Sequence, residues 1–309
     1  MRFALAAALL ALPVTALAQE AAEPPTPASV VAASTPEEWI AIDPAELLVM
    51  NLAPDAAGKD RQVVIQLVPA PFSEGWVGNI RKLAQAHWWD GTSVYRVVDN
   101  WVAQWGDADE TRALPDGVTD QPDDTYAVPR AIARNAALDA YLQPANDISR
   151  WASFHRGFPF AGTGGPDFAA NWPIHCYGSV GVARSVGSGG TGSELYAVIG
   201  HAPRQLDRNI AVVGRVIEGI EHLSTLPRGT GDAGVYETDE EHTPIVSVRL
   251  GDELPEAERP RFEYLASDSE SFARYLEVRA NRNDPFYRVP AGGVDLCSVQ
   301  VPIRRAAEE

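Results

Sequence analysis

Arg96 is the residue whose position in this chain most strongly indicates chemistry. It lies in the apolar segment 92–98, which is typical of a strand, and side chains two positions apart along a strand share a face. Arg96 would therefore lie beside Val94 and Val98, an unusual place for a charge unless that face lines a site. Arginine stays charged and offers a planar set of N–H donors that can hold a carbonyl oxygen. A surface salt bridge is the alternative explanation.

Three other groups of residues lack the spacing that their chemistry requires. The glycine-rich segment 187–192 is not followed by Lys and Ser or Thr, so we interpret it as a flexible loop and not a phosphate-binding loop. His155, His175 and Cys176 could form a metal cluster, but the sequence has no H-E-x-x-H motif and no paired C-x-x-C motif. A Ser-His-Asp hydrolase would be expected to show a G-x-S-x-G motif, which is absent. We expect no metal and no cofactor.

Short strands and few helices are expected to position Arg96. Apolar residues recur at helical spacing from 74 to 88, with Ser73 as the N-cap, and again from 216 to 226. Many strands with only two substantial helices favour a mainly β fold, a closed barrel with helical caps, over a parallel α/β sheet. The segments with strand character are 61–68, 92–98, 101–104, 177–183, 195–199, 210–213 and 245–250.

Two long regions interrupt or follow this pattern. Residues 108–176 contain seven prolines and one short segment with helical character at 131–141. A span of this length within a compact fold predicts a structured insertion and not a bare loop. Residues 255–309 form a C-terminal extension, in which Ser267 or Asp268 could cap a helix.

The N-terminus has the three-part layout of a secretory signal peptide over residues 1–18. Arg2 supplies a positive charge, 3–17 is apolar, and Ala16-Leu17-Ala18 supplies small residues at the cleavage site. A retained membrane anchor is the alternative, but the apolar run is short for a bilayer span of about 20 residues and Pro13 interrupts it. We therefore expect an exported, periplasmic protein with no stable membrane insertion after cleavage.

Composition limits the partners and the domain boundaries. The 309 residues are 45% hydrophobic and 22% charged, which is globular composition. The formal net charge of −17 disfavours nucleic acid, because an acidic surface repels phosphates. We predict a tether and lead-in segment over 19–58, with little structure in 19–36, and the main domain over 59–254.

The two cysteines, Cys176 and Cys297, are 121 residues apart. In an exported protein they could form one disulfide that connects the extension to the segment near Tyr177. The chain-entropy model gives such a bridge upwards of about 4 kcal/mol of stabilisation. Two free or buried thiols are the alternative, and the sequence does not decide between them.

Five sequence blocks occur in the order of a known family. The segment from Asp90 to Asp107 (DGTSVYRVV, then NWVAQWGD) resembles the central signature of cyclophilins, D-G-x-x-F-H-R-V-I followed by x-F-M-x-Q-G-G-D. The later blocks are GSVGVA at 178–183, GSELY at 192–196, LD at 206–207 and VGRVIEG at 213–219. The resemblance covers residues 61–251 outside the insertion. It implies an eight-stranded antiparallel barrel capped by two helices, and peptidyl-prolyl cis–trans isomerase activity on unfolded or folding polypeptides.

The resemblance assigns roles to Arg96 and Gln104. Rotation about an X–Pro bond breaks no bond and needs no nucleophile, metal or cofactor, but it must overcome a barrier of about 18–20 kcal/mol. In the twisted state the prolyl nitrogen gains a lone pair, so a donor aimed at it stabilises that state selectively. Arg96 would be this catalytic donor and Gln104 would hold the substrate backbone. Trp101 would floor the pocket, although strict alternation would turn it away from Gln104 unless a bulge intervenes.

Departures from the family pattern leave the strength of the activity open. Tyr95 replaces a His before the catalytic arginine, and Glu194 replaces a Gln, so a carboxylate could either pair with Arg96 or orient it. Gln205 and Ile210 also differ from the family. A catalytically weak or inactive cyclophilin-like binding or chaperone module is the alternative function. The positions that match the family's substrate pocket are Trp101, Val102, Ala183, Glu194, Tyr196, Leu206 and Ile210.

Overall fold

The fold is described by a computed structural model of the 309-residue chain. Its described residues are 23–129, 138, 141–143, 149–163 and 170–306. The predicted signal peptide and most of the helix expected at 131–141 lie outside these residues. Within them, no helix combines the length and the apolar character needed to cross a bilayer.

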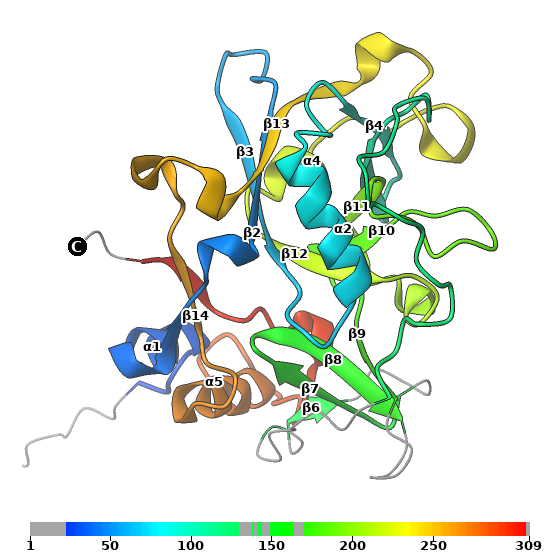
Figure 1. Cartoon of the computed structure of the whole chain (residues 1–309). Coiled ribbons are helices and arrows are strands. Elements are labelled where there is room, and N and C mark those ends of the chain that lie inside the picture. The colour runs from blue at the N-terminus through cyan, green and yellow to red at the C-terminus, as the bar shows by residue number, and fades with distance from the viewer. Residues whose placement is uncertain (1–22, 130–137, 139–140, 144–148, 164–169, 307–309) are drawn as a thin grey trace, which may run out of the picture.

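The centre of the protein is a closed barrel of antiparallel strands (Figure 1). Its strand order is β10-β11-β5-β4-β13-β2-β3-β12, and β12 pairs with β10 to close it. The predicted mainly β fold with an eight-stranded barrel is therefore confirmed. The barrel strands are β2 (Leu47–Leu52), β3 (Arg61–Leu67), β4 (Ser93–Val97), β5 (Val102–Gly106), β10 (Ser179–Val182), β11 (Leu195–Val198), β12 (Val212–Glu218) and β13 (Thr243–Leu250).

The segment before residue 59 contributes more to the fold than a tether would. Strand β2 lies between β13 and β3, so the barrel begins before the expected boundary. Residues 19–36 were expected to have little structure, but α1 (Pro27–Ala32) is a short helix. It begins after Thr26, whose hydroxyl accepts a hydrogen bond from the Ser29 N–H at 3.1 Å. Pro27 at the first helical position has the backbone geometry that a helix start favours.

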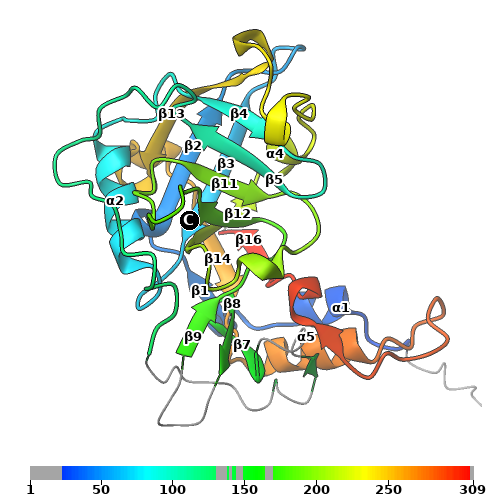
Figure 2. The same cartoon turned by 90° about the vertical axis from the view of Figure 1, so that its right-hand side faces the viewer.

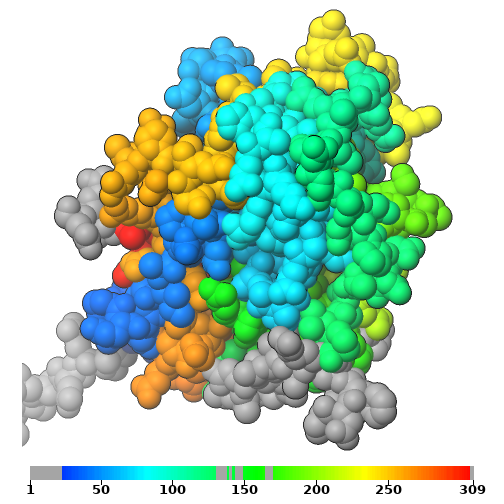
Figure 3. Space-filling view, in the orientation of Figure 1, coloured from blue at the N-terminus to red at the C-terminus, as the bar shows by residue number. Residues whose placement is uncertain are grey.

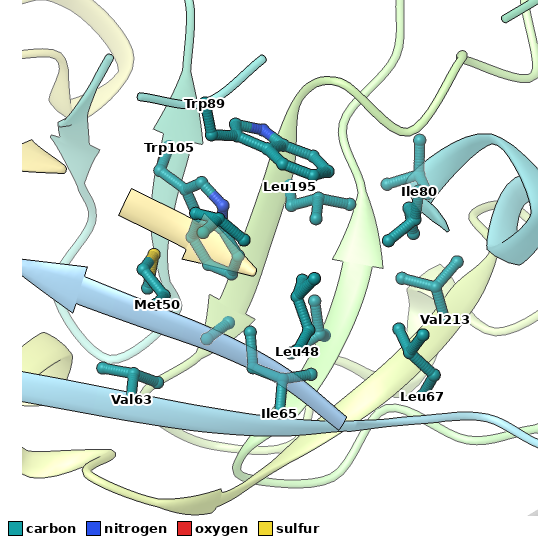
Figure 4. Close-up of a cluster of buried hydrophobic side chains, with 14 of the residues drawn as sticks. Leu48, Met50, Val63, Ile65, Leu67, Ile80, Trp89, Trp105, Leu195 and Val213 are labelled. Atoms are coloured by element: carbon teal, nitrogen blue, oxygen red, sulfur yellow. The ribbon is translucent and has the colours of Figure 1, made fainter. Parts of the chain in front are cut away.

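The barrel interior is filled by apolar side chains from every wall (Figure 4). Trp89 and Trp105 are among the largest of these and are almost completely buried. Strand alternation turns Ala103 and Trp105 of β5 into the barrel core and leaves Val102 and Gln104 facing outward. The barrel is thus a packed core without a lumen, and its chemistry must lie on the outside.

Helix α2 (Glu74–Gln85) covers one end of the barrel and buries Trp76, Ile80 and Leu83, as its helical spacing predicts. Ser73 occupies the N-cap position but does not cap. Its hydroxyl instead donates to the Val212 carbonyl at 2.7 Å.

The start of the insertion runs over the surface beside α2 (Figure 3). Asn79 and Trp88 donate side-chain hydrogen bonds to the carbonyls of Thr119 and Ala113, at 2.7 and 3.0 Å. These bonds attach the loop that forms one wall of the cavity described below.

The prediction of a second helix over 216–226 is mostly wrong. Strand β12 continues through Glu218 and pairs with both β10 and β3. Gly219, at φ +82°, ends the strand, and only α4 (Glu221–Ser224) is helical. The Val and Ile residues that matched a helical face also suit a strand, and pairing on both sides decides between the two.

The insertion contains a three-stranded antiparallel sheet, so it is structured as expected. Phe158 and Phe160 pack into the barrel core, whereas Phe154 and Trp172 pack into a second apolar core. The insertion thus connects the barrel with the rest of the molecule. Its strands are β7 (Trp151–His155), β8 (Phe158–Thr163) and β9 (Ala170–Pro173).

The C-terminal extension builds the second core on the side of the barrel away from β4 and β13 (Figure 2). Strand β14 pairs with β1 from the N-terminal region and with β16 from the C-terminal end. The Ser269 hydroxyl, not Ser267 or Asp268, caps α5. The elements of this layer are β1 (Trp39–Ala41), β14 (Phe262–Leu265), α5 (Glu270–Ala280), β16 (Ile303–Arg305), and β15 (Val294–Asp295), which pairs in parallel with β6 (Leu142–Gln143).

Short 3₁₀ helices join many of these elements. They lie at Pro36–Glu38, Pro44–Glu46, Arg204–Leu206, Asp232–Gly234, Asp239–Glu241, Gly251–Glu253, Glu256–Glu258 and Leu296–Ser298.

The two cysteines form a disulfide, with an Sγ–Sγ distance of 2.09 Å between Cys176 and Cys297. The bridge attaches the C-terminal extension to the segment that leads into β10. Of the two alternatives that the sequence left open, the structure contains the bridged one.

Candidate functional site

The hairpin of β4 and β5 positions the charged residue singled out by the sequence. Arg96 lies directly opposite Gln104, and the register shifts between Val94 and Arg96, so Tyr95 is the extra residue of a β-bulge. Val94 and Val97 both pack into the barrel core, whereas Tyr95 and Arg96 both line a cavity on the outer surface. The expectation that Arg96 shares a face with Val94 is therefore wrong, because the bulge shifts the alternation by one residue.

The guanidinium of Arg96 is held on one side and open on the other. Its NH1 donates to Gln104 Oε1 at 2.9 Å, and its Nε donates to the Ala233 carbonyl at 2.8 Å. Its Cζ lies 5.5 Å from the centre of the Trp101 ring. Within the described part of the chain, no other hydrogen bond is made by this guanidinium and no carboxylate pairs with it. Burial lowers the pKa of Arg96, but arginine remains charged at neutral pH.

Trp101 reaches the cavity because it belongs to the turn and not to the strand. Its backbone N–H donates to the Val98 carbonyl at 3.2 Å, and Asn100 before it has a φ of +51°. Strand β5 begins only at Val102, so strand alternation does not govern the direction of Trp101. The question that the sequence raised about this residue is resolved by the turn, without a bulge in β5.

An apolar cluster forms the floor of the cavity next to Arg96. Val102, Tyr196 and Val198 are buried in it, and the partly buried Trp101 and Ile210 pack against them. The cavity has a volume of about 500 Å³. The nine residues that the sequence placed in the site all line it, namely Arg96, Trp101, Val102, Gln104, Ala183, Glu194, Tyr196, Leu206 and Ile210.

Glu194 does not contact Arg96 and is connected to it through two other side chains. The Tyr95 hydroxyl donates to Glu194 Oε2 at 2.9 Å, and the backbone N–H of Asp107 donates to Glu194 Oε1 at 2.8 Å. Gln104 Nε2 in turn donates to the Tyr95 hydroxyl oxygen, while Gln104 Oε1 accepts from Arg96. Of the two possibilities left by the sequence, direct pairing with Arg96 does not occur, and an orienting contact remains.

Burial raises the pKa of two members of this connection, Glu194 and Tyr95. It raises the pKa of Glu194 to about 7, and the negative charges of Asp107 and Glu110 act in the same direction. The hydrogen bonds from the Asp107 N–H and from Tyr95 oppose this rise. Burial also raises the pKa of Tyr95 above its usual range, and the charge of Glu194 adds to the effect. Tyr95 therefore stays a neutral hydroxyl donor at physiological pH.

A buried polar chain supports the pocket wall from behind. The Tyr196 hydroxyl lies 2.9 Å from His175 Nε2, and His175 Nδ1 lies 2.9 Å from Asp207 Oδ1. The other oxygen of Asp207 accepts from Arg204 Nε at 2.5 Å. His175, whose sequence spacing did not indicate a metal ligand, thus contacts the side chain that lines the pocket. Among the described residues, no group of His, Cys, Asp and Glu is arranged to hold a metal.

Sequence reasoning missed Tyr95 and His175 as parts of the site. Tyr95 was noted only as a departure from a family pattern, since a bulge in β4 has no clear sequence signal. His175 lies before Cys176 in a region without regular patterning, so only the fold brings it to Tyr196. The one available signal was that Tyr95 and Glu194 both depart from the family, and the structure places them in contact.

Residues 58–250 match the family model for cyclophilin type peptidyl-prolyl cis-trans isomerase/CLD, which covers more than half of the chain. The chain belongs to the cyclophilin family. The family and the enzyme class expected from the sequence, a peptidyl-prolyl cis–trans isomerase, are thereby confirmed.

Solved structures show which fold this cyclophilin shares. It is similar to the crystal structure of cyclophilin AquaCyp293 from Hirschia baltica, with a TM-score of 0.65 and 22% identity, over 92% of this chain and 100% of the other. A weaker similarity, with a TM-score of 0.36 and 13% identity over 65% of this chain and 98% of the other, is to a Cryptosporidium parvum cyclophilin type isomerase whose crystal structure was obtained with the dipeptide Ala-Pro. No curated protein matches the sequence.

Proposed function

We propose that this cyclophilin accelerates rotation about X–Pro bonds in exported polypeptides, with Arg96 as the donor to the twisted prolyl amide. One observation carries the proposal. The Arg96 guanidinium is held by Gln104 beside the apolar floor of the cavity and keeps N–H groups without a partner among the described residues. This is the arrangement that a reaction without nucleophile or cofactor requires.

The geometry can stabilise the transition state more than either planar ground state. Twisting the amide localises a lone pair on the prolyl nitrogen, and a positioned N–H donor gains most at that point. The floor formed by Val102, Tyr196 and Trp101 can hold the prolyl ring and exclude water from the donor. An acceleration of about 10⁵-fold would need about 7 kcal/mol of such selective stabilisation.

Gln104 has one hydrogen-bonding group left for substrate. Its Oε1 accepts from Arg96 and one hydrogen of Nε2 is donated to Tyr95. The second Nε2 hydrogen can donate to a carbonyl oxygen of the peptide backbone. Arg96 and Gln104 would thus hold the peptide on the two sides of the bond that rotates.

The export of this cyclophilin and its periplasmic location are supported by two independent features. Residues 1–18 have the layout of a signal peptide, and the Cys176–Cys297 disulfide is typical of proteins in oxidising compartments. Intact mass analysis of the protein from a periplasmic extract should give a chain that begins at Gln19, with both cysteines protected from alkylation. A chain that retains Met1, or a cytoplasmic location, would contradict this part of the proposal.

Exchange NMR on a short Xaa-Pro peptide tests the catalytic part, because it measures cis–trans exchange without a coupling protease. The mature protein should accelerate exchange, and Arg96→Ala should remove most of the acceleration. Arg261→Ala is the matched control, because Arg261 does not line the cavity and its side chain forms a long ion pair with Glu256, at 3.8 Å, as its one ion pair among the described residues. Equal activity of the wild type and Arg96→Ala would reject the assigned mechanism.

A catalytically weak binding module remains the second candidate, and one observation favours it. The Ala233 carbonyl occupies the Nε donor of Arg96, which reduces the freedom of the guanidinium to follow a substrate. The same NMR experiment separates the two functions. A binding module would shift the peptide resonances on titration and leave the rate of exchange unchanged.

A further inference from the structure

We propose that Glu194 and Tyr95 are positioning residues, and that ionised Glu194 sets which way the Gln104 amide faces and thereby holds Arg96 ready for the substrate. In this arrangement both residues act on Arg96 through Gln104. The inference rests on the isomerase function proposed above and adds a proton-dependent control to it.

The direction of every hydrogen bond in the chain follows from the charge of Glu194. An ionised carboxylate can only accept, so the Tyr95 hydroxyl must donate to it. The Tyr95 oxygen is then left as an acceptor, and it takes a hydrogen from Gln104 Nε2. Gln104 Oε1 must therefore face the other way, toward NH1 of Arg96 at 2.9 Å.

Protonation of Glu194 removes this constraint. A neutral carboxylic acid carries an O–H that can donate to the Tyr95 oxygen, which frees the Tyr95 hydroxyl to donate to Gln104. The amide can then turn its oxygen toward Tyr95 and its Nε2 toward Arg96. Two donors would face each other there, so Arg96 would lose its side-chain acceptor and its fixed direction.

The backbone leaves a space shaped for this carboxylate. Gly106 has a φ of +151°, and a Cβ built on it would lie 2.1 Å from both oxygens of Glu194. The N–H of the next residue, Asp107, donates to Oε1. Any residue with a side chain at 106 would push the carboxylate away from Tyr95, so the end of β5 is formed to hold Glu194 in this place.

The surroundings of Glu194 explain why its charge can change near neutral pH. Burial raises the pKa to about 7, and the charges of Asp107 and Glu110 add to this rise. On the side of β4, the ring of His242 packs against Tyr95 at 6.5 Å, and its Nδ1 lies 3.2 Å from the Ser93 hydroxyl. The charged groups other than Glu194 that line the cavity are Arg96, Asp107, Glu110, Arg112, Asp120 and Arg184.

The pH profile of the exchange rate tests the proposal directly. With a group of pKa about 7 required in its ionised form, kcat/KM on an Xaa-Pro peptide without titratable groups should fall about tenfold from pH 8 to pH 6. Glu194→Gln keeps the shape but cannot ionise, so its profile should be flat. Tyr95→Phe keeps the carboxylate but breaks the connection, so its profile should also be flat, with kcat/KM at pH 8 lowered about five- to tenfold.

Two control variants separate the relay from general effects of charge and folding. Glu263→Gln removes a carboxylate that pairs with Arg304 outside the cavity, and it should keep the wild-type profile. Gly106→Ala should give the flat profile of Glu194→Gln, because it displaces the carboxylate without removing it. Circular dichroism at pH 6 and pH 8 checks that each variant is folded.

A second readout does not depend on activity. The side-chain amide resonances of Gln104 should titrate with a midpoint near pH 7 in the wild type and should not titrate in Glu194→Gln. A flat wild-type pH profile, or a Gln104 amide that ignores pH, would overturn the relay and leave the isomerase function standing. A wild type that is inactive at every pH would instead overturn the proposed function, while the amide titration would still decide the relay.

Discussion

Two arginine–glutamine pairs lie on the barrel wall and serve different purposes. Arg96 on β4 lies opposite Gln104 on β5, and Arg215 on β12 lies opposite Gln66 on β3. In both pairs the guanidinium donates to the glutamine Oε1, at 2.9 Å from Arg96 and at 2.8 Å from NH2 of Arg215. The pair itself is therefore not what makes a catalytic site.

The difference lies in how many donors of each guanidinium are already used. All three nitrogens of Arg215 donate, two to Gln66 Oε1 and one to the Gly157 carbonyl at 2.6 Å, and its Cζ lies 4.6 Å from the centre of the Phe158 ring. Burial lowers the pKa of Arg215 to about 10. One nitrogen of the Arg96 guanidinium has no partner among the described residues. A barrel arginine thus becomes a structural bond where the insertion completes its hydrogen bonds, and an available donor where they stay incomplete.

The largest effect is expected from removal of Arg96, the arginine with a free donor. Arg96→Ala should lower kcat/KM by about 10²–10³-fold, as is typical for loss of a donor to a transition state. The free energy of unfolding should change by less than about 1 kcal/mol, since the side chain is only partly buried. Exchange NMR and urea denaturation measure the two quantities. A large loss of stability with little loss of activity would give Arg96 the same role as Arg215.

The disulfide and Arg215 line the same cavity of about 790 Å³, on the side of the barrel that faces the C-terminal extension. The double variant Cys176→Ser/Cys297→Ser should lose about 4–5 kcal/mol in the free energy of unfolding, because the bridge closes a loop of 121 residues. Urea denaturation measures this loss, and reduction of the wild type should reproduce it. Unchanged stability in both experiments would show that the C-terminal extension stays packed against the barrel without the bridge.

Removal of Arg215 should affect stability and not catalysis. Arg215→Met keeps apolar volume but leaves Gln66 Oε1 and the Gly157 carbonyl without a donor, which should cost about 2–3 kcal/mol in the free energy of unfolding. The kcat/KM of the folded fraction should stay within about threefold of the wild type. A tenfold loss of activity at full stability would mean that the two pairs are coupled.

The smallest effect is expected in the pH dependence of the free energy of unfolding. It should distinguish the two pairs, because Glu194 is linked to the Arg96 pair. Its pKa is raised in the folded state, so the folded protein binds the proton more tightly than the unfolded chain does. Stability should therefore decrease as pH rises from about 5 to 7, by about 1–2 kcal/mol. Urea denaturation at several pH values should show this slope in Arg215→Met and not in Glu194→Gln. A slope that survives in Glu194→Gln would assign it to other groups.

Strand β3 and the first helix could be predicted because their patterns have one interpretation. The β-branched run of β3 and the apolar face of α2 agree with their packing. The helix expected at 216–226 failed because Val216, Ile217 and Ile220 fit both a strand and a helical face. Pairing of β12 with two neighbours, which no local pattern contains, decided for the strand.

Family resemblance could locate the site residues, but it could not predict the hydrogen bonds that connect them. All nine line one cavity, whereas the reason first given for Arg96, alternation with Val94, does not hold. The bulge at Tyr95 turns two successive side chains to the same side, which cannot be predicted from the alternation of side chains along a regular strand. The contact between Tyr95 and Glu194 joins residues 99 positions apart, so only the closed barrel creates it.

Strand β14 takes one neighbour, β1, from the N-terminal region of the chain and the other, β16, from its last few described residues. Residues 303–305 must therefore have been synthesised before this small sheet can close. A nascent polypeptide that lacks residues 303–305 would carry β14 with an open edge, and a tag fused directly after them would lie next to that edge. Fusions intended to preserve the native assembly are better placed at the exposed turn near Gly58, which does not line the cavity and where an added Cβ would meet no atom within 4 Å.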